Sequence, residues 1–188
     1  SKFKIILIEG TKNTLNNMSN EAMLASKKYL EKMGVIVLKE TIVKDYDGNT
    51  LTFNNGDSIK TKTVIWAAGV TGNRLRGLTD NLLTKGNRIK VDRINKILDS
   101  QNIFALGDIA FMQTDKYPLG HPQVANVAIN QAKRLAKNLK CLKTNKPTTN
   151  FEYKDHGSMA TIGRNKAVVD LPFIKFKGYL AWLVWMFL

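Results

Sequence analysis

Three apolar stretches of the sequence each end in residues that could contact hydroxyl groups or a flat ligand. They are Glu9 after the first stretch, Ala68 and Gly69 after the second, and Gly107 and Asp108 after the third. A carboxylate accepts hydrogen bonds from paired hydroxyls, such as those of a ribose or a polyol chain. Small residues let the backbone approach a ligand closely. The three stretch ends together therefore predict a ligand site.

Each of these ends also has an ordinary structural explanation. Glu9 could be an acid in solvent, and Ala68 and Gly69 could serve tight packing of a strand end against a helix. Asp108 could cap a loop through an Asx-turn. No single stretch decides between the two explanations, but their agreement at three strand ends favours a ligand.

The elements that must position these residues alternate between strand and helix. Residues 3–8 form a run that is apolar except for Lys4, which is typical of a buried parallel strand. A helix is expected over residues 19–34, with Ser19 as N-cap and Gly34 just past the last turn. Its expected apolar face comprises Met23, Leu24, Lys27 (through its stem), Leu30 and Met33.

The rest of the chain continues this alternation. A short strand at 35–40 precedes a small antiparallel insertion, whose turns fall at 47–49 and 54–56. The remaining expected elements are a buried strand at 63–67, two short strands within 87–108, a helix over 121–140 with Pro122 in or near its first turn, and antiparallel strands beyond residue 150. This order predicts an α/β fold in which a mainly parallel sheet with helices carries an antiparallel meander.

Composition and charge exclude several classes of site. The 188 residues are 44% hydrophobic and carry a net charge of +14, which favours an anionic partner. A single cysteine, Cys141, excludes an internal disulfide, a CxxC redox pair and an all-cysteine cluster within the chain. His121 and His156 lie far apart in the sequence, so we expect no metal site and place both on the surface or beside a site.

Four stretches taken together resemble a known family. They are "TVIWAAGV", "NIFALGDIA", "HPQVANVAINQAKRLAKNL" and the carboxy-terminal "GSMATIGRNKAVVDL" with the aromatic tail after it. The sequence resembles type II NADH dehydrogenases, the single-subunit NADH:quinone oxidoreductases that pump no protons. The first two motifs occur in all flavoproteins with two dinucleotide-binding domains, whereas the carboxy-terminal segment is far more specific to the type II enzymes.

The resemblance implies two cofactors, FAD and NADH, with roles for the residues above. Glu9 would hold the adenosine ribose of NADH, and a carboxylate there disfavours the 2′-phosphate of NADPH. Ala68 and Gly69 would line the nicotinamide side. Gly107 would leave room for Asp108 to bind the ribityl chain of FAD.

The resemblance also assigns a role to the start of the helix after residue 121. Pro122, Val124 and Ala125 would bring this helix start against the pyrimidine carbonyl of the flavin. Helix starts carry unpaired N–H groups and partial positive charge, which suits the anion that develops on a reduced flavin.

The quinone-binding motif of the family, Ala-Gln-x-Ala-x-Gln, is altered in this sequence. Asn126 and Asn130 stand in place of the two glutamines, four residues apart on one helix face. Each keeps the amide but loses one methylene of reach. Gln131 is a candidate substitute, although it points about 100° away from Asn130. A solvated polar face remains the alternative explanation.

The tail "LPFIKFKGYLAWLVWMFL" combines apolar and aromatic residues with Lys175 and Lys177. Aromatic rings and lysines favour the headgroup boundary of a bilayer. We expect a monotopic anchor on the cytoplasmic face of the cell membrane, where the basic stretch would meet anionic lipid. A buried core helix and a truncated transmembrane helix are the alternatives.

The chain is expected to hold three regions. Residues 1–72 would be the second part of an NADH-binding domain, residues 73–146 the closing part of an FAD-binding domain, and residues 147–188 the membrane-anchoring region. No Gly-x-Gly-x-x-Gly motif occurs, so the resemblance implies phosphate-binding turns before Ser1 and an inactive isolated fragment. A second copy of the chain, as a homodimer, is a further candidate partner.

Two other functions are alternatives to this interpretation. Another flavoprotein reductase with two dinucleotide-binding domains, such as a ferredoxin or rubredoxin reductase, would share the general motifs but not the aromatic tail. A basic nucleic-acid-binding module would suit the charge of +14. We expect no nucleic acid partner, because the lysines are not interleaved with aromatic residues and no recognition motif is present.

Overall fold

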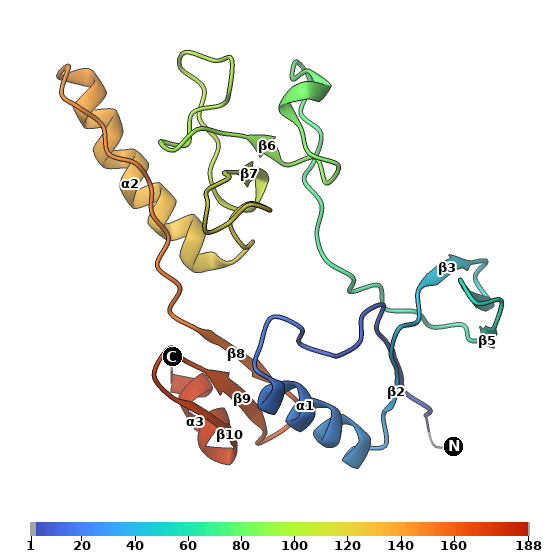
Figure 1. Ribbon diagram of the computed structural model, residues 1–188. Coiled ribbons are helices and arrows are strands. Elements are labelled where there is room, and N and C mark those ends of the chain that lie inside the picture. The colour runs from blue at the N-terminus through green and yellow to red at the C-terminus, as the bar shows by residue number, and fades with distance from the viewer. Residues whose placement is uncertain (1–2, 188) are drawn as a thin grey trace. The chain divides into compact units, whose positions relative to one another are not determined.

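The computed structural model describes residues 3–187, and the chain divides into two units (Figure 1). The first comprises Ser1–Trp66 with Asp155–Leu188, and the second is Ala67–Lys154. Among the described residues, strands pair in parallel in two small sheets and antiparallel in two others. The fold is therefore mixed α/β. The expected dominance of a parallel sheet is wrong, because the glycine-punctuated segments close antiparallel hairpins instead.

The first unit begins with the expected strand, helix and strand. They are β1 (Ile6–Ile8), α1 (Asn20–Lys32) and β2 (Ile36–Leu38). The two strands pair in parallel with Ile6 opposite Ile36. The prediction of a helix capped by Ser19 is confirmed, because the Ser19 hydroxyl accepts a hydrogen bond from the backbone N–H of Ala22.

The face that α1 buries differs from the predicted one. The buried residues are Ala22, Ala25 and Ser26, whereas Leu24 is 70% exposed and Met33 is 44% exposed. Helix α1 packs on strand β9 (Ala167–Asp170). A close approach between helix and strand favours small side chains at the contact. Helical periodicity alone predicts that the larger apolar side chains are the buried ones.

The antiparallel insertion agrees with the prediction. It consists of β3 (Val43–Tyr46), β4 (Thr50–Phe53) and β5 (Ser58–Lys60), in the spatial order β3-β4-β5. Its first turn is closed by Asp47, whose carboxylate accepts hydrogen bonds from the N–H groups of Asn49 and Thr50 at 2.8 and 2.7 Å.

The predicted buried strand at 63–67 is wrong. The segment is irregular, and Ile65 and Trp66 are 87% and 67% exposed. A strand exists only when a neighbour satisfies its backbone groups, and within residues 3–187 no strand lies alongside this segment. The apolar composition alone therefore misidentified it.

A second antiparallel sheet closes the first unit. It contains β8 (Ser158–Thr161), β9 and β10 (Lys175–Gly178), with β9 in the middle, and helix α3 (Tyr179–Phe187) follows at once. Strand β9 is buried on both faces, because Val168 packs with α1 residues while Ala167 and Val169 pack with Ala181 of α3. The tail is therefore a strand up to Gly178 and a helix only from Tyr179.

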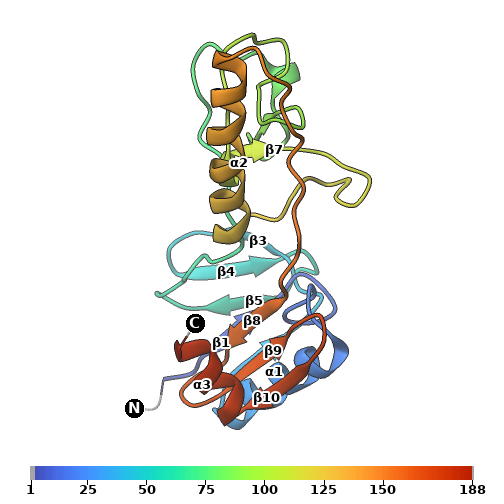
Figure 2. The same ribbon diagram turned by 90° about the vertical axis from the view of Figure 1, so that its left-hand side faces the viewer.

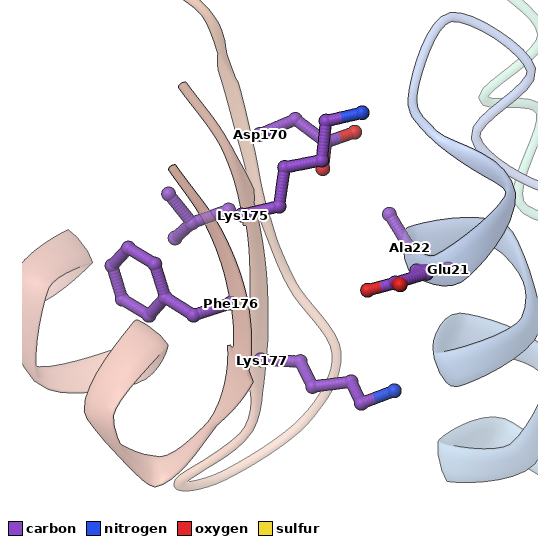
Figure 3. Close-up of a pocket in the computed structure, with 7 residues that line it drawn as sticks. Glu21, Ala22, Asp170, Lys175, Phe176 and Lys177 are labelled. Atoms are coloured by element: carbon purple, nitrogen blue, oxygen red, sulfur yellow. The ribbon is translucent and has the colours of Figure 1, made fainter. Parts of the chain in front are cut away.

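Successive side chains of β10 also point to opposite faces of the sheet. Figure 3 shows Phe176 directed toward α3, and Lys175 and Lys177 directed toward the side of α1. At the start of α1, the carboxylate of Asp170 accepts hydrogen bonds from the N–H and the hydroxyl of Ser19. An acid from the carboxy-terminal sheet therefore occupies the positive end of this helix.

The second unit has shorter strands and one long helix (Figure 2). Strands β6 (Ile89–Lys90) and β7 (Ala110–Phe111) pair in parallel, the 3-10 helices η1 (Asp80–Leu82) and η2 (Gly107–Ile109) precede each of them, and α2 (Ala125–Lys143) follows. Its core includes Ile89, Met112, Val127 and Phe151. The strand expected before Gly107 is reduced to one bridge between Lys96 and Phe104.

Helix α2 starts later than predicted. Its N-cap is Val124, with an extended backbone, so Pro122 lies outside the helix and not in its first turn. Pro122 also follows His121, and a residue before proline is driven away from helical conformation. The helix extends to Lys143, three residues beyond the predicted end.

His121 is a core residue and not a surface one. It is 1% exposed and packs on Tyr117, with ring centroids 4.7 Å apart. Its Nδ1 hydrogen-bonds the carbonyl oxygen of Met112 at 3.1 Å, and its Nε2 has no hydrogen-bond partner among residues 3–187. Burial disfavours the imidazolium and lowers the pKa of His121 below its ordinary value of 6.5, although the Met112 hydrogen bond opposes this.

The lowered pKa makes stability depend on pH in one direction. The neutral imidazole is the buried form, so the free energy of unfolding should be highest above pH 6.5. It should fall as the pH drops toward the folded-state pKa, by at most about 1.4 kcal/mol per pH unit, because only the unfolded chain then gains the proton. Urea unfolding between pH 7.5 and 5 measures this slope. The His121→Asn variant should show a shallower slope of stability against pH than the wild type. The control variant His156→Asn changes an exposed residue and should show the wild-type slope. Equal slopes in all three proteins would contradict the account.

Candidate functional site

The turn at Gly107 and Asp108 lies directly against helix α2. Gly107 has a φ of 72° and donates its N–H to Oε1 of Gln131 at 2.7 Å. A Cβ at Gly107 would come within 3.3 Å of the Ala128 Cβ. Glycine is therefore needed both for the left-handed backbone and for the close approach to the helix.

The side chain of Asp108 is exposed to solvent, while its backbone carbonyl is held by hydrogen bonds. The residue is exposed, and its carbonyl oxygen accepts hydrogen bonds from Nε of Arg88 at 3.1 Å and Nε2 of Gln123 at 3.2 Å. Because both bonds go to the main chain, the carboxylate is left for an external hydroxyl donor. The residue predicted to bind a polyol is thus accessible, although it sits in 3-10 helix η2 and not at a strand end.

The start of α2 lies beside this turn and has no side-chain cap. Val124 occupies the N-cap position and offers no acceptor, whereas Ser19 caps α1. Ala125 is the first helical residue and is exposed. The Gln123 bond to Asp108 and the close approach of Gly107 to Ala128 hold the turn and this helix start together. An anion or carbonyl oxygen could accept hydrogen bonds from the free N–H groups here.

The polar residues that follow on α2 divide between surface and core. Asn126 is exposed, and Asn130 is half-buried and donates its side-chain N–H to the Asn126 carbonyl at 2.8 Å. Gln131 is only 1% exposed, and its amide oxygen is engaged by Gly107. The expectation that Gln131 substitutes as a ligand-contacting amide is corrected, since the turn occupies it.

Ala68 and Gly69 lie exposed at the beginning of the second unit. Gly69 has a φ of 93°, and the chain then reaches Gly72, whose N–H bonds the Gly86 carbonyl at 2.8 Å. A Cβ at Gly72 would collide with the Asn87 carbonyl oxygen at 2.6 Å and the Ile109 side chain at 2.7 Å. The segment after Ala68 and Gly69 is thus packed against Ile109, the neighbour of Asp108.

Glu9 belongs to the first unit and continues the parallel pairing beyond β1. Its N–H bonds the Leu38 carbonyl at 2.8 Å, and its carboxylate Oε1 accepts from the N–H and the hydroxyl of Thr11 at 2.9 and 2.7 Å. The acid is therefore fixed at the carboxyl end of a parallel strand, which is where such sheets bind ligands.

Arg88 is a residue that the sequence reasoning missed. Its guanidinium donates to three backbone carbonyls, those of Asp108, Ala110 and His121. Burial lowers the pKa of Arg88 and the Asp108 charge partly opposes this. No local pattern marks the residue, because its partners lie 20 to 33 positions away in the chain.

A pocket elsewhere in the first unit is not the candidate site. It is lined by Glu21, Ala22, Val169, Asp170, Lys175, Phe176 and Lys177. None of the predicted site residues lines it, and its two carboxylates and two lysines balance one another (Figure 3). Within residues 3–187, no group of three or more His, Cys, Asp or Glu residues is arranged to hold a metal ion.

Comparison with known sequences identifies relatives along the whole chain. Residues 2–132 match the family described as pyridine nucleotide-disulphide oxidoreductase. The type II NADH:quinone oxidoreductase of Mycobacterium tuberculosis is 32% identical and is matched over 100% of this chain and 42% of its own length. That of Haemophilus influenzae is 29% identical, over 91% of this chain and 38% of its own length. These matches confirm the resemblance inferred from the sequence motifs.

Solved structures share the fold of this chain. NDH2 from Plasmodium falciparum in complex with NADH has a TM-score of 0.84 at 20% identity, over 98% of this chain and 54% of that one. The sulfide:quinone oxidoreductase of Aquifex aeolicus has a TM-score of 0.72 at 14% identity, over 97% of this chain and 48% of that one. At these identities the likeness shows the fold alone, and the chain spans less than two thirds of either structure.

Proposed function

Because the chain belongs to the pyridine nucleotide-disulphide oxidoreductase family, we propose that it is part of a type II NADH:quinone oxidoreductase. The net reaction takes NADH, a proton and a quinone to NAD⁺ and quinol, without proton pumping. The observation that carries the proposal is the turn at Gly107 and Asp108, held against the uncapped start of α2. The sequence similarity to the Mycobacterium tuberculosis enzyme supports the same activity.

The residues of the second unit suit FAD. Asp108 would bind the ribityl hydroxyls with its exposed carboxylate, and Gly107 leaves the space that a side chain would fill. Val124 and Ala125 would turn the N–H groups of α2 toward the pyrimidine carbonyl, and Pro122 leads the chain to that point. When bound, FAD supplies a centre that accepts two electrons with a hydride and passes them to a quinone. The protein's part is to bind, orient and stabilise charge.

Two separate contacts with NADH are proposed. Glu9, fixed by Thr11, would accept hydrogen bonds from the adenosine ribose. Ala68 and Gly69 would let the nicotinamide lie close to the backbone, since neither carries more than a methyl group. Residues 1–72 would form the second part of an NADH-binding domain, and residues 73–146 the closing part of an FAD-binding domain.

Replacing Glu9 with glutamine should weaken NADH binding and reduce the preference over NADPH. The variant keeps the shape but loses the charge that strengthens hydrogen bonds to the ribose and repels a 2′-phosphate. We expect the KM for NADH to rise about tenfold, the loss of one charge-assisted hydrogen bond, with little change in kcat. Steady-state kinetics with both nucleotides measure this. Glu31→Gln, which removes an exposed ion pair with Lys27 on α1, is the matched control, and equal KM values for Glu9→Gln and wild type would refute the assignment.

The quinone would be contacted by Asn126 and Asn130 on α2. Asn126 is exposed next to the helix start, and the bond from Asn130 to its carbonyl aligns the two residues. The shorter asparagine side chains would need the quinone carbonyl to approach the helix more closely than glutamines would. Gln131 is not part of this contact, because it holds the turn at Gly107.

A membrane surface is the proposed location. The exposed apolar residues of α3 include Tyr179, Leu180, Trp185 and Phe187, and Lys175 and Lys177 lie just before the helix. Such a combination suits the headgroup boundary of a membrane with anionic lipid on its cytoplasmic face. Within residues 3–187, every helix is too short or too polar to cross a bilayer. A homodimer is a further proposal, which light scattering of the purified protein tests.

The proposed function is tested with the full-length polypeptide. Cofactor released by heat should be FAD, and the protein should oxidise NADH with a water-soluble quinone as acceptor. Oxidised ferredoxin should not replace the quinone as electron acceptor. A purified protein with no flavin, or one that oxidises NADH only with ferredoxin present, would overturn the proposal.

A further inference from the structure

Arg88 connects the two parts of the second unit that the proposed function assigns to FAD. We infer that Arg88 is a positioning residue for the flavin, which fixes the turn at Asp108 relative to the segment that leads into α2. The inference rests on the proposed function, because the ligand it positions for is FAD. Arg88 itself contacts main-chain oxygens and acts on the ligand through them.

The guanidinium joins three segments of backbone at once. Its Nε donates to the Asp108 carbonyl at 3.1 Å, and its Nη2 donates to the carbonyls of Ala110 at 2.7 Å and His121 at 3.0 Å. Asp108 lies in η2, Ala110 begins β7, and His121 lies just before the start of α2. A planar fork of donors can satisfy all three oxygens, whereas the single ammonium of a lysine cannot reach the same geometry.

The surroundings hold the guanidinium in this position. Its carbon lies 5.5 Å from the centre of the Phe111 ring, a cation–π distance. Gly120 makes room for that ring, since a Cβ there would lie 2.7 Å from Phe111 and 3.4 Å from Nη1 of Arg88. The backbone N–H of Arg88 also bonds the Thr84 hydroxyl at 3.1 Å. The side chain is therefore pre-organised, and little entropy is lost in making its bonds.

Two side chains donate hydrogen bonds to the carbonyl oxygen of Asp108. Gln123, between His121 and the start of α2, donates to the same oxygen that Arg88 reaches through Nε. Without Arg88, the turn and the start of α2 would be linked through Gln123 and through the Gln131 bond to Gly107. The ribityl chain and the pyrimidine ring are joined covalently in one cofactor, so a shift between these two supports weakens the fit of both contacts.

The test compares substitutions of Arg88 with a matched substitution of Arg93 in the full-length polypeptide. Arg93 is also a backbone clamp in the second unit, donating to the Phe151 carbonyl at 2.7 Å and pairing with Glu152. Arg88→Lys keeps the charge, Arg88→Met removes it, and Arg93→Lys reproduces the chemical change at a site away from the turn. The readouts are the dissociation constant of FAD for the apoprotein, the visible spectrum of bound FAD, thermal unfolding of the apoprotein, and kcat and KM at several FAD concentrations.

Both Arg88 variants should raise the dissociation constant of FAD about tenfold or more, because the contacts to the ribityl chain and the pyrimidine ring would no longer be held in register. Added FAD should restore kcat while the KM for NADH stays at the wild-type value, and the visible spectrum should shift. Arg93→Lys should lower thermal stability to a similar degree and leave FAD affinity unchanged. FAD binding by Arg88→Lys and Arg88→Met as tight as in wild type, or equally weakened in Arg93→Lys, would overturn the inference while the proposed function stands. A wild-type protein that binds no FAD would overturn both.

Discussion

Replacing Asp108 with alanine should strip FAD from the full-length protein and abolish NADH oxidation unless FAD is added in excess. The carboxylate is expected to accept two hydroxyl hydrogen bonds from the ribityl chain. Each charge-assisted bond is worth about 1.5–3 kcal/mol, so FAD affinity should fall by about a hundredfold or more. The measurement is the dissociation constant of FAD, obtained by quenching of flavin fluorescence on the apoprotein.

The fold should survive this change. Asp108 is exposed, and its backbone carbonyl, not its side chain, holds the hydrogen bonds from Arg88 and Gln123. Asp115→Ala removes another exposed acid of the same unit and is the matched control. FAD affinity that is equal in Asp108→Ala, Asp115→Ala and wild type would contradict the role of Asp108.

Replacing Leu180, Trp185 and Phe187 with serine should release the full-length protein from vesicles that contain anionic lipid. These α3 side chains are 69%, 46% and 81% exposed, so their apolar surface is available to lipid. Burial of each is worth about 1.5–3 kcal/mol, and losing three should reduce partitioning about a thousandfold or more. Co-sedimentation with vesicles of phosphatidylcholine and phosphatidylglycerol measures the change.

Point substitution is a sharper test here than deletion. Removing residues 171–188 would also remove β10 and Ala181, and would uncover Ala167 and Val169 in the centre of the sheet. The double variant Leu24→Ser with Ile42→Ser changes other exposed apolar residues of the same unit and serves as control. If the triple variant sediments with vesicles as the wild type does, α3 is not the anchor.

Local signals in the sequence predicted several elements correctly. Ser19 correctly indicated the start of α1, and the turn residues around Asp47 and Asn55 indicated the antiparallel insertion. These features depend on interactions between residues close in the chain, which composition and spacing report directly. A helix after Asp108 was also predicted, although α2 starts at Ala125 and not near Pro122.

Features that depend on distant contacts were not predictable in this way. Gln131 is polar and was assigned to ligand binding, yet it is buried because Gly107 needs a hydrogen-bond acceptor. Arg88 carried no signal, since its three acceptors come from later parts of the chain. The strand expected at 63–67 is absent because strand formation requires a neighbour, which apolar composition does not provide.

The most direct test of the proposed function follows the absorbance of bound flavin in the full-length protein under anaerobic conditions. NADH is added first, and a water-soluble quinone is added after the absorbance has settled. The account predicts that NADH bleaches the flavin and that one equivalent of quinone restores its absorbance. A flavin that NADH does not bleach, or a bleached flavin that quinone leaves unchanged, would contradict it.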